Sequence, residues 1–121
     1  MTSSQSYPDP KAPSAPVDRA HLSRYTLGNA QLERDVLELF STQSAAYLAK
    51  LKVAGNDKDW CEAAHSLKGS ARAIGAWRLA EAAERAEALG PKPITHATLI
   101  MEVQGALDEA RAYIGALLKD G

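Results

Sequence analysis

Residues 100–117, IMEVQGALDEARAYIGAL, decide the fold class of this 121-residue chain. Their apolar side chains recur at spacings of 3, 4, 3, 4 and 3 residues, at Ile100, Val103, Leu107, Ala110, Ile114 and Leu117. This spacing places them on one stripe of a helix and is typical of helices that pack in a bundle. We therefore predict a long last helix in this region, with Thr95 as its N-cap.

Helical patterns also cover most of the chain before residue 95, and no run of alternating β-branched residues is long enough to predict a strand. We expect a short helix from about residue 17 to 25, capped by Asp18. Three longer helices should end near residues 54, 74 and 89, the first capped by Asn29 and the second by Asn56 or Asp57. The predicted fold is all-α: an antiparallel up-and-down four-helix bundle with a short additional N-terminal helix.

The predicted helices differ in the side chains that they turn inward. In the helix that ends near residue 54, the expected inward stripe is Leu32, Val36, Leu39, Phe40, Gln43, Tyr47 and Leu51. In the alanine-rich helix at about 76–89, we expect Leu79, Ala83 and Ala86 to face inward. Small side chains there would let a neighbouring helix approach closely.

Composition limits the class of protein. Hydrophobic residues make up 45% and charged residues 24% of the chain, as in an ordinary globular domain, and the net charge of -1 argues against a nucleic-acid-binding surface. No apolar run approaches the roughly 18 residues of a membrane span, and the start of the chain lacks the apolar stretch of a signal peptide. The single cysteine, Cys61, excludes an intramolecular disulfide and fits a reducing compartment. We therefore expect a cytoplasmic protein with no membrane association.

The N-terminal segment differs from the rest. Residues 1–17 contain four of the six prolines and almost no large apolar side chains. Such a segment cannot bury enough surface to offset the entropy lost on ordering. We predict a flexible Pro/Ser-rich tail over residues 1–17, followed by one helical-bundle domain over residues 18–121.

The candidate functional residues lie in the stretch HSLKGSARAIG, residues 65–75. A helix turns about 100° per residue, which gathers Trp60, Ala64, Leu67, Ala71 and Ile74 on one buried stripe. His65 then lies about 140° from that stripe and faces solvent, whereas Lys68 lies near the border between the two faces.

Gly69 is unusual because a glycine within a helix costs about 1 kcal/mol relative to alanine. It follows His65 by four residues and Lys68 by one, so it leaves open space beside both side chains. An exposed imidazole with a cation and free space beside it is suited to carrying a transferable charged group.

This stretch resembles the histidine-containing phosphotransfer (HPt) domain family. The pattern His-x-Leu-Lys-Gly-Ser, followed by a glycine and then by a leucine on the next helix, is matched by His65, Leu67, Lys68, Gly69, Ser70, Gly75 and Leu79. Residues 22–29 and 36–40 resemble the entry to the family's second helix and the stretch that follows, so the likeness covers about residues 17–118.

The resemblance implies a phosphorelay intermediate on an up-and-down bundle. His65 would accept a phosphoryl group from a receiver-domain aspartate and pass it to another receiver aspartate, with Lys68 as charge support, Gly69 as steric clearance and Arg72 as a possible auxiliary. The partners would be receiver domains of a hybrid histidine kinase and of a response regulator, which bring their own Mg²⁺. The chain would need no cofactor, would act as a monomer, and would dock through the surface around His65, including Leu22 and Tyr25. It has no phosphate-binding GxxxxGK[ST] loop, so we expect no autonomous kinase activity.

Two alternatives remain open at this stage. One is an interaction module that docks and regulates a receiver or kinase without transferring phosphate. The other is a metal-dependent bundle enzyme, because Glu62-Ala63-Ala64-His65 has the Glu-x-x-His spacing of di-iron bundles, although those need two such motifs facing inward. We interpret the charged run Glu81, Glu84, Arg85 and Glu87 as a solvated face with local pairing.

Overall fold

Five helices make up the computed structural model, which describes residues 15–120. Their bounds are α1 Arg19–Thr26, α2 Ala30–Val53, α3 Asp57–Ile74, α4 Trp77–Leu89 and α5 His96–Asp120. Within the described range there is no strand, so the predicted all-α class is confirmed. Residues 1–14, most of the predicted tail, lie outside the described residues.

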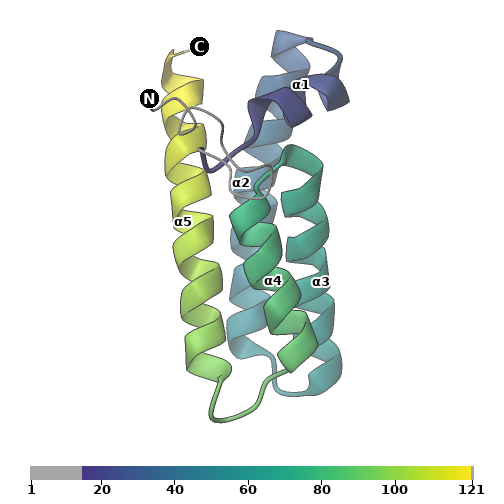
Figure 1. Ribbon diagram of the computed structural model, residues 1–121, viewed down its shortest axis with the longest axis vertical. Coiled ribbons are helices and arrows are strands. Elements are labelled where there is room, and N and C mark those ends of the chain that lie inside the picture. Colours follow the sequence, from purple (N-terminus) through teal and green to yellow (C-terminus); the bar gives the residue numbers. More distant parts are fainter. Residues whose placement is uncertain (1–14, 121) are drawn as a thin grey trace, which may run out of the picture.

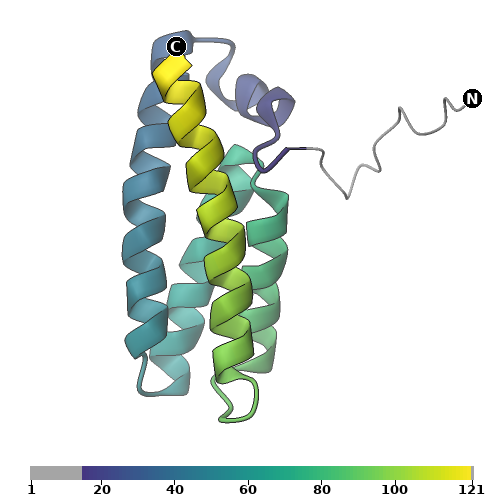
Figure 2. The same cartoon turned by 90° about the vertical axis from the view of Figure 1, so that its left-hand side faces the viewer.

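The four long helices lie side by side, and α1 lies beyond the ends of α3 and α4, beside the end of α2 (Figures 1 and 2). The α2–α3 and α4–α5 connections are at the end of the bundle away from α1, whereas the α3–α4 turn is beside α1 (Figure 1). Helix α3 packs between α2 and α4, while α5 contacts the same two helices from the opposite side. One face of α3 is therefore left outside the bundle.

Three helices begin at the predicted N-caps. The side chains of Asp18, Asn29 and Asn56 accept hydrogen bonds from the backbone N–H groups of His21, Leu32 and Asp59. Each cap satisfies a donor that the helix cannot satisfy itself, and such caps contribute about 1 kcal/mol each. In contrast, the hydroxyl of Thr95 donates to the carbonyl of Lys92, 3.4 Å away, before α5 begins.

The predicted inward face of α3 is confirmed. Its five stripe residues, Trp60, Ala64, Leu67, Ala71 and Ile74, are all buried. Trp60 also donates its indole N–H to the carbonyl of Ala86 on α4, at 2.7 Å. The alanines of α4 that contact the core leave room for this large ring close to the α4 backbone.

The predicted stripe of α2 is wrong in part. Phe40 and Leu51 are buried as predicted, Val36 and Tyr47 are half-buried, and Leu32, Leu39 and Gln43 are exposed. The other buried positions are Leu37, Ser44 and Leu48. The apolar pattern of the sequence does not reveal the buried stripe of α2, because this stripe includes the polar residue Ser44. The Ser44 hydroxyl donates to the Phe40 carbonyl at 2.6 Å, so this polar group lies in the core without an unsatisfied bond.

The stripe of α5 is shifted at its ends. The four central positions of the predicted stripe are buried, namely Val103, Leu107, Ala110 and Ile114. The two end positions, Ile100 and Leu117, are only half-buried, and Leu99 is buried in place of Ile100. In the described part of the chain, no helix is both long enough and apolar enough to cross a bilayer.

Asp18 fixes α1 to the α3–α4 turn. Its backbone N–H donates to the carbonyl of Gly75 at 2.9 Å, and its carboxylate accepts from the indole of Trp77 at 3.0 Å. Gly75 has a φ of 79°, and a Cβ atom there would lie 2.7 Å from the Cβ of Asp18, so the turn requires glycine. Val17, which the sequence analysis placed at the end of the tail, is buried in the core, so the packed domain extends at least to this residue.

Candidate functional site

His65 lies in the middle of α3 on the face outside the bundle, as predicted. Its side chain is 69% exposed, whereas its neighbours Ala64 and Leu67 are buried. The imidazole lines a shallow surface hollow together with Cys61, Glu62, Ser66 and Glu87. A partner can therefore reach the ring without any rearrangement of the core.

Glu87 of α4 connects His65 to Lys68. Its Oε2 lies 3.2 Å from His65 Nδ1, and its Oε1 lies 2.7 Å from Lys68 Nζ. The hydrogen bond from Lys68 is the largest cause that lowers the pKa of Glu87, and burial opposes it; the contact with His65 lowers the pKa further. Glu87 is therefore a carboxylate at neutral pH, held by two groups of α3.

This carboxylate decides how the imidazole is arranged. An ionised carboxylate only accepts hydrogen bonds, so the bond to Glu87 requires the proton on Nδ1. In the neutral ring, the lone pair then lies on Nε2. The contact with Glu87 thus leaves Nε2 as the ring nitrogen available to react with an external group.

Glu87 was not predicted as a site residue, because the charged run that contains it was interpreted as a solvated face. A usable signal was present, because His65 lies ten residues before Gly75 and Glu87 lies twelve residues after it. In an antiparallel helix pair that turns at Gly75, two such positions lie at nearly the same level. Only the structure shows that both side chains lie at the same α3–α4 seam.

Lys68 and Arg72 both pair with carboxylates of α4. Lys68 is largely covered, with 16% of its side chain exposed, as expected for a residue at the border of the buried face. Arg72 Nη2 lies 3.6 Å from Glu84 Oε1, one turn before Glu87, and Arg72 is not part of the cluster around Glu87. The structure thus brings His65, Lys68 and Glu87 together and leaves Arg72 in a separate pair.

Gly69 is not required by packing within the described chain. A Cβ atom at this position would meet nothing within 4 Å, and its φ does not require glycine. Close approach of another helix is therefore not the reason for this glycine. The predicted role in steric clearance for an external group stays a prediction, and the open space fits it.

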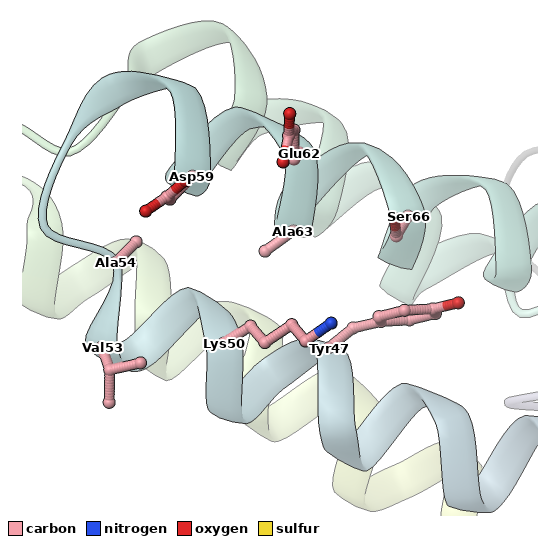
Figure 3. Close-up of a pocket in the computed structure, with 8 residues that line it drawn as sticks. All are labelled: Tyr47, Lys50, Val53, Ala54, Asp59, Glu62, Ala63 and Ser66. Carbon is pink, nitrogen blue, oxygen red and sulfur yellow. The ribbon is translucent and has the colours of Figure 1, made fainter.

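A second pocket lies between α2 and α3 (Figure 3). Its volume is about 380 Å³. The lining residues are Tyr47, Lys50, Val53, Ala54, Asp59, Glu62, Ala63 and Ser66. Glu62 and Ser66 also line the hollow of His65, so the two depressions adjoin.

The structure gives no support to the metal-enzyme alternative. Over the residues described, no group of three or more His, Cys, Asp or Glu side chains is arranged to hold a metal ion. Glu62 and His65 are both exposed, and Glu62 lies 3.9 Å from Lys58. The thiol of Cys61 is 3.9 Å from the backbone carbonyl of Glu87.

The prediction that Leu22 contributes to the docking surface is wrong. Leu22 is a fully buried residue of α1 and cannot contact a partner, whereas Tyr25 is exposed. Leu22 was chosen for its apolar character, but that character serves to attach α1 to the core. The exposed large apolar residues nearest in sequence to Tyr25 are Leu27 and Leu32.

Comparisons with known proteins give a family match and a fold match. A family model described as the Hpt domain matches residues 35–115. The fold is similar to the crystal structure of the histidine phosphotransferase ShpA from Caulobacter crescentus, with a TM-score of 0.69 and 31% sequence identity. That match covers 88% of this chain and 93% of the other. A comparison with curated proteins finds no match.

Proposed function

The chain belongs to the Hpt domain family and has a histidine phosphotransfer role, and from this premise we propose that His65 carries the phosphoryl group. Hpt domains work with the receiver domains of two-component systems. In our proposal, His65 accepts the group from an aspartate of one receiver and passes it to an aspartate of another. The donor receiver belongs to a hybrid histidine kinase and the acceptor to a response regulator.

The observation that carries this proposal is the arrangement of the imidazole. It is exposed, its Nδ1 is held by Glu87, and its Nε2 is free to react. In the forward step, the Nε2 lone pair attacks phosphorus, the N–P bond forms, and the P–O bond to aspartate breaks. The aspartate leaves as a carboxylate with the electron pair, and the Nδ1 proton stays in place.

The reverse step gives the group to the second receiver. An aspartate oxygen attacks phosphorus, the P–N bond breaks, and the electron pair returns to Nε2. Because the Nδ1 proton is retained throughout, the leaving group is a neutral imidazole. The contact with Glu87 favours this proton position in both directions.

The neighbours of His65 contribute charge and space. Lys68 follows by three residues, so its ammonium group is within reach of a phosphoryl group on the ring. The open surface at Gly69 leaves room for the group and for the receiver loops around it. Phosphoryl transfer depends mainly on alignment and charge neutralisation, and we propose that the receiver supplies the remaining charge through its own Mg²⁺.

Labelling from phosphorylated receiver domains tests this proposal. Wild-type protein should take up an acid-labile, base-stable phosphoryl group, and His65→Gln should take up none. His96→Gln removes another histidine that lies outside the site and should label like the wild type. If a broad receiver panel labels none of the folded proteins, the interaction module without transfer becomes the better account.

A further inference from the structure

We propose that Glu87 competes with the phosphoryl group for Lys68, and that this competition favours release of the group from His65 over its retention. The inference rests on the proposed function, because it concerns the phosphorylated form of His65. It assigns a second part to Glu87, separate from its contact with the imidazole. Glu87 is a positioning residue here, since it acts on the phosphoryl group through Lys68.

The contacts show that Lys68 is already engaged before phosphorylation. Its Nζ lies 2.7 Å from Glu87 Oε1, which is a short, charge-assisted hydrogen bond. Both side chains are largely covered, with 16% of Lys68 and 26% of Glu87 exposed. Partial cover reduces solvent screening, so this pair is stronger than an ordinary surface ion pair.

The carboxylate cannot be neutralised easily to free the lysine. Lys68 and His65 both lower the pKa of Glu87, so it stays ionised at neutral pH. Of the other basic residues of α3, Arg72 is paired with Glu84 of α4 and Lys58 with Glu62 of α3. The cations on this side of α3 are therefore already paired with carboxylates before a phosphoryl group is added to Nε2.

Phosphorylation changes the charge balance of this cluster. A phosphoryl group brings up to two negative charges and three acceptor oxygens. Lys68 has three N–H donors but a single positive charge, so movement of its ammonium group toward the phosphoryl group weakens its attachment to Glu87. Glu87 therefore reduces the electrostatic stabilisation that Lys68 would otherwise give to the phosphoryl group. As a result, the phosphorylated state is less stable than it would be beside a lysine with no carboxylate partner.

A double-mutant cycle separates this effect from the contact between Glu87 and the ring. Glu87→Gln removes the charge but keeps an acceptor oxygen for Nδ1. Lys68→Met removes the cation but keeps an apolar stem of similar length. The direct effect of Glu87 on the imidazole is present with either residue at position 68, so it cancels in the cycle.

The probe is phosphoramidate, a small phosphoryl donor that needs no receiver. Nε2 attacks its phosphorus, the N–P bond to the ring forms, and the donor's P–N bond breaks as ammonia leaves with the electron pair. At fixed phosphoramidate and ammonia concentrations, the ratio of phosphorylated to free protein, read from intact mass, measures the stability of the phosphohistidine. His65→Gln corrects for any labelling elsewhere.

The two backgrounds should respond differently to Glu87→Gln. Glu87→Gln should raise the ratio of phosphorylated to free protein in both backgrounds. The factor of increase should be at least roughly three times larger with Lys68 present than in the Lys68→Met background. Equal responses in the two backgrounds, or a smaller rise with Lys68 present, would overturn the inference.

A matched control and a separate readout complete the test. Glu81→Gln makes the same change on α4 at an exposed position that borders α5, and it should leave the ratio unchanged. Unfolding curves of all variants exclude a general loss of structure. The phosphoramidate assay uses no receiver, so its result is independent of the receiver-labelling test. Failure of receiver labelling would count against the proposed function, whereas the phosphoramidate ratios alone decide whether Glu87 competes with the phosphoryl group for Lys68.

Discussion

At the scale of single residues, we propose that Glu87 sets which nitrogen of His65 reacts. Its Oε2 lies 3.2 Å from Nδ1, which requires the proton on that nitrogen. We expect the phosphoryl group on Nε2, as measured by ³¹P–¹⁵N couplings in protein with labelled histidine. A phosphoryl group on Nδ1 would show that Glu87 does not hold the ring in solution as it does in this structure.

Gly69 offers a second residue-scale prediction because nothing in the chain fills the space at its Cβ. Gly69→Ala should stabilise the protein by up to about 1 kcal/mol, since alanine is the better helix former. Gly115→Ala, at an exposed glycine of α5 whose Cβ would also meet nothing within 4 Å, is the matched control and should stabilise similarly. Urea unfolding measures both.

Function should separate these two positions. Gly69→Gln should slow phosphoryl transfer from a receiver by about tenfold or more while the protein stays folded, because a long side chain would fill the space beside His65. Gly115→Gln should transfer at the wild-type rate. Normal transfer in Gly69→Gln would remove the case for steric clearance.

The sequence predicted the positions of individual site residues on α3 better than their contacts with residues of other helices. The turn of the helix was enough to place His65 outside and Lys68 at the border, because both follow from positions within one helix. Glu87 belongs to another helix, 22 residues away, and its contact depends on how α3 and α4 align. That alignment comes from tertiary packing, which periodicity within one helix does not contain.

At the scale of helices, α2 shows the limit of apolar patterns. The predicted stripe ran through Leu39, whereas the observed stripe runs through Ser44 and Leu48. Helix-capping residues were easier to predict, because a cap depends on a few neighbouring residues. A buried serine satisfied by its own helix looks like a surface residue when only polarity is considered.

Two leucines of α2 test which stripe is correct. Leu48→Ala should lower the free energy of unfolding by about 2–5 kcal/mol, because it leaves a cavity in the core. Leu39→Ala changes a side chain that is 56% exposed and should cost less than about 0.5 kcal/mol. Equal costs in urea unfolding would contradict the observed orientation of α2.

At the scale of the whole molecule, one carboxylate attaches α1 to the bundle. The Trp77 hydrogen bond is the largest cause that lowers the pKa of Asp18, followed by the bond from the His21 backbone; burial opposes both. A pKa that is lower in the folded state means that the ionised group stabilises the fold above the unfolded pKa, near 3.8. This stabilisation is lost as the pH falls through the folded pKa.

Acid unfolding should therefore depend on Asp18. Asp18→Asn keeps a capping oxygen but cannot ionise, so its free energy of unfolding should fall less than that of the wild type as the pH drops below about 3.8. Parallel acid responses in Asp18→Asn and the wild type would show that this carboxylate does not stabilise the attachment of α1.

The all-α class followed from the sequence because two kinds of pattern agreed: apolar periodicity and N-capping residues. The division into a tail and a domain remains a prediction, with Val17 now placed in the packed part. The surface that receives a partner could not be predicted in the same way, since apolar residues such as Leu22 serve the core as readily as an interface.

The most direct test of the central claim is a reconstituted relay. A phosphorylated receiver domain and a second receiver that does not exchange phosphate with it directly are mixed with the wild-type chain or with His65→Gln. The account predicts that label reaches the second receiver only when the wild type is present, with a transient label on the chain itself. Equal transfer with His65→Gln, or transfer without label on the wild type, would contradict the claim that His65 carries the phosphoryl group.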